Sequence, residues 1–315
     1  MSRPSKPVSL ARLSDLTLGA FAGVPQSETI DHLIRYLGTW SGSDKLFMII
    51  QYAVKIIVPL LELRARLQHR AGLRASPVSD AVKGYAKLGS IVGDARTLWR
   101  IWGLLPIVQW LVSLERNPQP TRRLLNIERL QGWSMLAYYP LEHLYYLCTN
   151  GIIPSTVPSL KSLVSSRAKP IKLDPNWLGL WSSRFWAAYV LLQFAHLKED
   201  RALLLAKTRT LIKAKQRASG QSSPTVSEQK ELDQRWDAFW NELVVNLGYL
   251  PLTVHWSLEK GLFGNDIWVG IFGLVAALAS FRAGWRATAL PSAPADSNTE
   301  PSKPSVKDVV FDAGN

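Results

Sequence analysis

Apolar residues recur at helical spacing through most of the chain, most clearly between Val82 and Gly103. In that stretch apolar and aromatic side chains return every three or four positions, so they share one face of a helix: Tyr85, Leu88, Val92, Ala95, Trp99 and Trp102. The residues off that face are mostly basic: Lys83, Lys87, Arg96 and Arg100. An aromatic apolar face beside a basic face is typical of helices at the boundary between lipid tails and anionic headgroups. A core helix with solvated charges is the alternative.

The same spacing predicts helices before this stretch. Helical patterning begins at Thr29, and we expect Gly38 to end the first helix. Ser41 or Ser43 should cap the next helix. Polar residues and a proline interrupt the apolar run 47–61 of that second helix, so we do not interpret it as a membrane span.

Two later segments are more continuously apolar. Residues 101–114 are nearly uninterrupted but fall short of the ~20 residues that span a bilayer. Residues 267–285 carry a single charge, Arg282, and form the best transmembrane candidate. Because Arg282 and Arg286 stand at its C-terminal end, the positive-inside tendency places that end in the cytosol.

These patterns predict an all-α, membrane-associated helical bundle with amphipathic helices and one or two membrane-inserted segments. The expected parts are a flexible N-terminal segment (1–28), an N-terminal helical region (29–116), a central region rich in Trp and Tyr (117–217), a disordered linker (218–227), C-terminal helices (228–286) and a disordered tail (287–315).

Composition narrows the choice of partner. Lys and Arg number 37 against 24 Asp and Glu, a net charge of +13, and 13 of the 315 residues are Trp. A positive charge points to an anionic partner, and indole rings concentrate at the depth of lipid headgroups. The composition therefore favours an anionic phospholipid membrane, and we expect no nucleic-acid partner.

The search for reactive groups yields no constellation for catalysis. No two of the five histidines stand at metal-binding spacing, and the single cysteine, Cys148, excludes an intramolecular disulfide. Glu142 and His143 are neighbours, but neighbours on a helix point about 100° apart, so we interpret them as packing and hydrogen-bonding residues. We expect no enzyme activity, no cofactor and no metal site.

Gly89 and Gly93 form a Gly-x-x-x-Gly pattern on the amphipathic helix between Val82 and Gly103. Small residues at this spacing permit close contact between helices. We therefore mark both as candidate helix-contact residues, although the pattern is also common by chance.

Four stretches in this order make the chain similar to the peroxin-11 family of peroxisomal membrane proteins, most closely to its fungal members. They are IRYLGTWSGSDKLF at 34–47 with IQY at 50–52, the amphipathic helix between Val82 and Gly103, YYPLEHLYYL at 138–147 with GII at 151–153, and NLGYLPLTVHWS at 246–257 with GIFG at 270–273. Glu142 stands where the family pattern leads us to expect Asp, and residues 154–176 and 218–227 have no counterpart that we can assign.

The resemblance implies a protein of the peroxisomal membrane with both termini in the cytosol. It implies elongation of the membrane before division, self-association into a homo-oligomer, contact with the organelle fission machinery, and no catalytic residues. The expected mechanism is insertion of the amphipathic helix into one leaflet, which expands that leaflet and curves the bilayer. The alternatives are a membrane channel or metabolite carrier, and a mainly soluble α-helical adaptor.

Overall fold

The computed structural model describes residues 14, 17–19, 21, 24–117, 119–158, 169–217 and 226–290. Helices dominate these residues, which confirms the all-α prediction. Most of the predicted N-terminal segment, linker and tail lies outside the described part of the chain, although α8 already begins at Val226 and α9 ends at Ala287. In order, the elements are α2 (Glu28–Leu37), α3 (Trp40–Arg70), α4 (Asp80–Trp99), the 3₁₀ turn η2 (Arg100–Gly103), α5 (Leu104–Arg116), α6 (Arg122–Thr149), β1 (Thr156–Val157), β2 (Ile171–Lys172), α7 (Pro175–Arg217), α8 (Val226–Ser257) and α9 (Asp266–Ala287).

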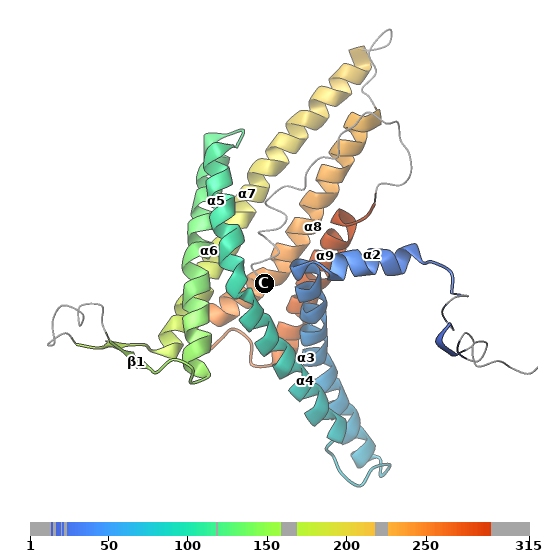
Figure 1. Ribbon diagram of the computed structural model, residues 1–315, viewed down its shortest axis with the longest axis vertical. Helices are drawn as coiled ribbons and strands as arrows, with labels where there is room; N and C mark the ends of the chain where they lie inside the picture. Colours follow the sequence, from blue (N-terminus) through green and yellow to red (C-terminus); the bar gives the residue numbers. More distant parts are fainter. Residues whose placement is uncertain are drawn as a thin grey trace, which may run out of the picture.

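The long helices form three hairpins, α3–α4, α5–α6 and α7–α8, and α9 packs against both α3 and α8 (Figure 1). The α3–α4 and α7–α8 hairpins extend toward opposite ends of the molecule (Figure 1). Strands β1 and β2 pair antiparallel in a short ribbon between α6 and α7. The two ends of the α3–α4 hairpin differ in their surroundings. One end packs among the other helices, and the end with the connecting loop projects from the molecule (Figure 1).

The core lies where α3, α5, α6, α7, α8 and α9 meet. Its most deeply buried members include Met48, Tyr139, Val190, Leu252 and Ala276. Small residues bring the helices close, because a Cβ built on Gly273 would lie 2.3 Å from the Tyr52 ring. Each large apolar side chain buried here contributes roughly 1.5–3 kcal/mol relative to exposure.

The predicted C-cap of α2 is confirmed, and the predicted N-cap of α3 is wrong. Gly38 ends α2 as predicted. Thr39, and neither Ser41 nor Ser43, caps α3, and its hydroxyl accepts a hydrogen bond from the Gly42 backbone N–H at 2.9 Å. The prediction missed the cap because α3 already begins at Trp40.

Among the described residues, three helical segments are long and apolar enough to cross a membrane by length and composition: Trp40–Arg70, Asp80–Arg116 and Asp266–Ala287. The last contains the predicted span 267–285. The first includes residues 47–61, whose polar side chains led us not to interpret them as a span. Two of those polar groups have partners inside the protein: Gln51 accepts a hydrogen bond from Arg96, and Lys55 pairs with Asp266 at 2.7 Å.

Candidate membrane-contact site

Helix α4 carries the candidate site. Asp80 stands in its first turn, where a carboxylate is favourable at the positive end of the helix dipole. The helix gives way to the 3₁₀ turn η2 at Arg100. Gly103 ends that turn tightly against α6, since a Cβ there would lie 2.5 Å from the Tyr139 ring. The chain then continues as α5 in a different direction (Figure 1).

One side of α4 packs on α3 through its glycines. A Cβ built on Gly89 would lie 3.0 Å from Val54 Cγ1, and one on Gly93 would lie 2.8 Å from Gln51 Nε2. Both predicted helix-contact residues therefore lie at the α3 interface. A larger side chain at Gly93 would displace the Gln51 amide group, which accepts a hydrogen bond from Arg96.

An exposed apolar surface, which we call the α4 apolar face, lies on α4 and η2 beside the α3 contact, and at its edge the Trp99 ring lies 5.8 Å from the Phe47 ring of α3. Trp102 is 66% exposed, and the other members are 41–53% exposed. Four of the six predicted membrane-inserting residues belong to this face, and sequence reasoning missed two more members. Its residues are Tyr85, Leu88, Ile91, Leu98, Trp99 and Trp102.

Two predicted membrane-inserting residues lie elsewhere. Val92 is only 7% exposed and faces the protein, and Ala95 is half-buried. The reason is geometric: the α3 contact occupies the sector of α4 that holds Gly89, Val92 and Gly93, so the exposed sector is rotated toward Ile91 and Leu98. The spacing of apolar residues predicted an apolar face centred near Val92, whereas the exposed face is centred nearer Ile91 and Leu98.

The four predicted headgroup cations divide into two pairs. Lys83 and Lys87, in the first half of α4, are exposed. Arg96 is buried, and its Nε and Nη2 donate to the two Asp44 carboxylate oxygens at 2.8 and 3.1 Å. Its Nη1 donates to Gln51 Oε1 at 2.7 Å. Arg96 is thus withdrawn from any lipid headgroup, which corrects our expectation for this residue.

Arg100 also turns inward, toward α6. Its Nη1 lies 3.1 Å from Glu142 Oε1 and donates to the Tyr138 hydroxyl at 3.0 Å. The Tyr138 hydroxyl in turn donates to Glu142 at 2.7 Å. Burial raises the pKa of Tyr138 well above its usual value, so the phenol remains a donor. Arg100 therefore links η2 to α6 through Glu142 and Tyr138. This contact corrects our expectation that Arg100 binds a lipid headgroup.

Glu142 and His143 do not converge on a common target. Glu142 belongs to the Arg100 pair, whereas His143 Nδ1 lies 2.7 Å from the Tyr139 carbonyl oxygen in its own helix. The sequence led us to interpret Glu142 as a packing and hydrogen-bonding residue. That interpretation missed Arg100 as the partner, since the two residues stand 42 positions apart.

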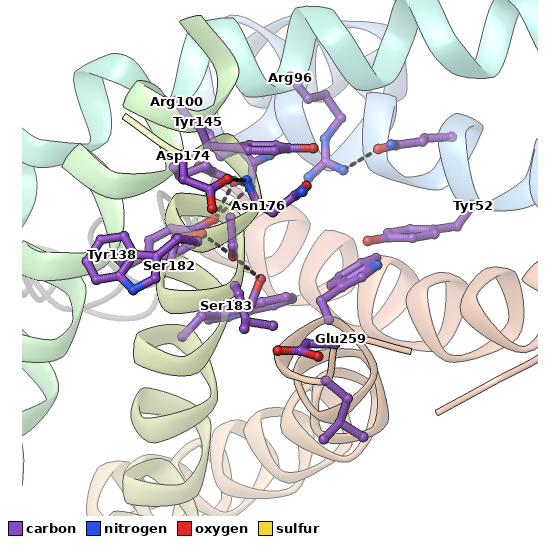
Figure 2. Close-up of a pocket in the computed structure, with 18 residues that line it drawn as sticks. Tyr52, Arg96, Arg100, Tyr138, Tyr145, Asp174, Asn176, Ser182, Ser183 and Glu259 are labelled. Atoms are coloured by element: carbon purple, nitrogen blue, oxygen red, sulfur yellow. Dashed lines mark hydrogen bonds and ion pairs between the residues drawn. The ribbon is translucent and has the colours of Figure 1, made fainter. Parts of the chain in front are cut away.

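A cavity of about 860 Å³ opens beside this polar cluster, between α3, η2, α6, the start of α7 and the end of α8. Figure 2 shows Arg96 and Arg100 on one side of it and Ser183 and Glu259 across from them. Aromatic rings form much of the remaining wall. Both arginines already hold carboxylates of the protein, Asp44 and Glu142, so the cluster serves first to join helices. Across the described ranges, no group of three or more His, Cys, Asp or Glu side chains could hold a metal ion.

Comparison with known proteins agrees with this membrane-facing architecture. The family model for Peroxisomal biogenesis factor 11 (PEX11) matches residues 30–285. The chain belongs to the peroxin-11 family. This peroxin-11 protein is 26% identical over 209 residues to an uncharacterized protein of Schizosaccharomyces pombe, and the match covers 66% of this chain and 80% of the relative. No solved structure matches the chain.

Family membership makes this a peroxisomal membrane protein of peroxisome biogenesis and proliferation. It also places the chain among biogenesis factors and not in an enzyme family.

Proposed function

We propose that this peroxin-11 protein elongates and remodels the peroxisomal membrane by inserting the α4 apolar face into one leaflet. In this way it promotes peroxisome proliferation and division. The observation that carries the proposal is the exposure of six large apolar side chains on one side of α4 and η2, next to the exposed cations Lys83 and Lys87. A leaflet that accepts this face gains area on one side only, so the bilayer curves.

The energetics favour insertion. Transferring six large apolar side chains from water contributes on the order of 5–15 kcal/mol, with the lower end appropriate because these side chains are already partly covered. Lys83 and Lys87 each add about 1 kcal/mol on an anionic surface. Because α4 is already held as a helix against α3, binding does not have to order a free peptide.

The proposal includes the partners and the topology of the protein. The partners are an anionic phospholipid membrane, further copies of the chain in a homo-oligomer, and the organelle fission machinery. Arg282 and Arg286 at the end of α9 favour a cytosolic C-terminus, and we propose that both termini are cytosolic. Protease added to intact organelles should then remove a tag placed after Asn315, and full protection of the tag would reverse this orientation.

The decisive experiment changes Leu88, Ile91 and Trp99 to Ser in the full-length chain. We expect the variant to reach peroxisomes at normal abundance but to leave them unelongated. Normal elongation at normal abundance would refute insertion of this face. A matched control makes the same number of Ser substitutions at exposed apolar positions of α7, where elongation should persist: Leu203, Leu205 and Ile212.

A second candidate function, a channel or metabolite carrier, is favoured by a specific pair of observations. The described part of the chain has three segments with the length and composition of membrane spans, and a cavity lined by Arg96, Arg100 and Glu142. Ionisable residues inside a membrane domain often mark a solute path. Solute release from vesicles containing the full-length protein tests it: a carrier loses flux in Glu142→Gln but keeps flux in the α4 triple-Ser variant.

A further inference from the structure

The projecting end of the α3–α4 hairpin has a surface of its own, which we call the hairpin tip. It comprises the last two turns of α3, the connection 71–79 and the first turn of α4 (Figure 1). Three apolar side chains stand out from it: Leu73 is 80% exposed, and Leu67 and Val78 are more than half exposed. A group of exposed apolar side chains at the end of a helical hairpin is typical of a surface that contacts a membrane or another protein.

The backbone of the tip holds this exposure in place. Gly72 adopts a left-handed conformation, with φ +70°, which ends α3 and turns the chain. The Leu73 N–H donates to the Gln68 carbonyl oxygen at 2.9 Å, and His69 Nδ1 lies 3.0 Å from the Arg74 carbonyl oxygen. Leu73 is therefore directed outward by an ordered turn.

The tip is strongly basic. Between residues 64 and 83 there are five Lys or Arg residues and one carboxylate, Asp80. Glu62 pairs with Arg66 at 3.1 Å, within the same helix. None of the ion pairs formed among the described residues engages Arg64, Arg70 or Arg74. These cations contrast with Arg96 and Arg100, whose charge is used inside the protein.

We propose that the hairpin tip binds the headgroups of anionic phospholipids, with Leu73, Leu67 and Val78 dipping into the interface. This inference rests on the proposed membrane-remodelling function and deepens it. Apolar side chains surrounded by cations match an anionic lipid surface, which offers headgroup phosphates outside and hydrocarbon within. The tip leads directly into the α4 apolar face at Tyr85 and Leu88, so one bilayer surface can engage both. Arg64, Arg70 and Arg74 then supply the headgroup contacts that Arg96 and Arg100 cannot make.

The test uses the full-length protein with a single reporter cysteine. Cys148 is the only cysteine, so Cys148→Ser combined with Leu73→Cys allows one environment-sensitive fluorophore at the tip. The protein is reconstituted in vesicles of phosphatidylcholine alone or of an equal mixture with phosphatidylserine. We expect the label to be quenched by a lipid-borne quencher in the mixed vesicles and by aqueous iodide in the neutral ones. High salt should abolish the difference in quenching between the two vesicle types, because it screens the electrostatic attraction.

Changing Arg64, Arg70 and Arg74 to Gln should lower the ratio of lipid to iodide quenching about tenfold in the mixed vesicles. The matched control changes three exposed cations of α7, Arg209, Lys213 and Lys215, and should leave that ratio unchanged. Equal iodide quenching in both vesicles, or an equal loss in the α7 control, would overturn the proposal.

A second label separates this proposal from the proposed function. With Leu88→Cys in the same background, a lipid-exposed label at Leu88 and a water-exposed label at Leu73 would overturn the tip alone. A water-exposed label at Leu88 with a lipid-exposed label at Leu73 would support lipid binding by the tip and contradict insertion of the α4 apolar face.

Discussion

The two halves of α4 carry the same kinds of residue but do different things. In the first half, which begins at the hairpin tip, Lys83 and Lys87 are exposed. In the second half and η2, the cations form ion pairs inside the protein. Arg96 pairs with Asp44 of α3, and Arg100 pairs with Glu142 of α6. The position of a cation along an amphipathic helix therefore decides whether it serves lipid binding or folding. Charge patterning on one helix cannot reveal this, because the deciding carboxylates are on other helices.

The largest effect should come from breaking the buried pair. Arg96→Gln leaves Asp44 charged, 3% exposed and without its bidentate partner. Loss of one partner of a buried ion pair destabilises a fold by about 3–5 kcal/mol. We expect a large fall in the midpoint of thermal unfolding of the detergent-solubilised protein and low abundance in cells. Arg96→Gln combined with Asp44→Asn should cost less than the sum of the two single changes, and strict additivity would contradict the coupling.

An intermediate effect should come from the glycine contact. Gly93→Leu places a side chain where even a Cβ lies 2.8 Å from Gln51, and overpacking of this kind costs about 1–3 kcal/mol. Gly84 is the matched control on the same helix, since nothing lies within 4 Å of a Cβ built there. Gly84→Leu should leave the unfolding midpoint unchanged or raised. Similar losses for both glycines would show that α4 does not pack on α3 through Gly93.

A smaller effect is expected at Glu142. Glu142→Gln retains an oxygen that accepts from Tyr138 and Arg100 but loses the charge, so we expect a destabilisation of about 1–2 kcal/mol. Together with His143→Ala, peroxisome elongation should stay within a few-fold of wild type when the protein accumulates normally. Complete loss of elongation in a folded, abundant double variant would mean that this pair acts directly in function.

The smallest effect on stability should come from Lys83→Gln with Lys87→Gln. Both side chains are exposed, and surface substitutions of this kind change the free energy of unfolding by no more than about 0.5 kcal/mol. Association of the α4 apolar face with anionic vesicles should nevertheless weaken, and strong salt should weaken wild-type association in the same way. A fall in the unfolding midpoint like that of Arg96→Gln would remove the distinction between the two halves of α4.

Most of the helices could be predicted because their signals are local. The spacing of apolar residues predicted the α4 helix, and the apolar run 267–285 falls within α9 (Asp266–Ala287). Gly38 was recognised as a helix end from its neighbours alone. The family resemblance was also readable, because it depends on the order of short motifs.

The sequence by itself determined that this chain is helical, basic, rich in Trp and a member of the peroxin-11 family. Only the tertiary structure decided which side of α4 is free and which of its cations are used internally. Arg96 meets Asp44 across 52 positions, and Arg100 meets Glu142 across 42. Burial of a charge is favourable only where such a partner is held in place, and the partner's position depends on how α3, α4 and α6 pack together. The amphipathic pattern specified a helix with two faces, and the packing of the neighbouring helices selected the face left for the membrane.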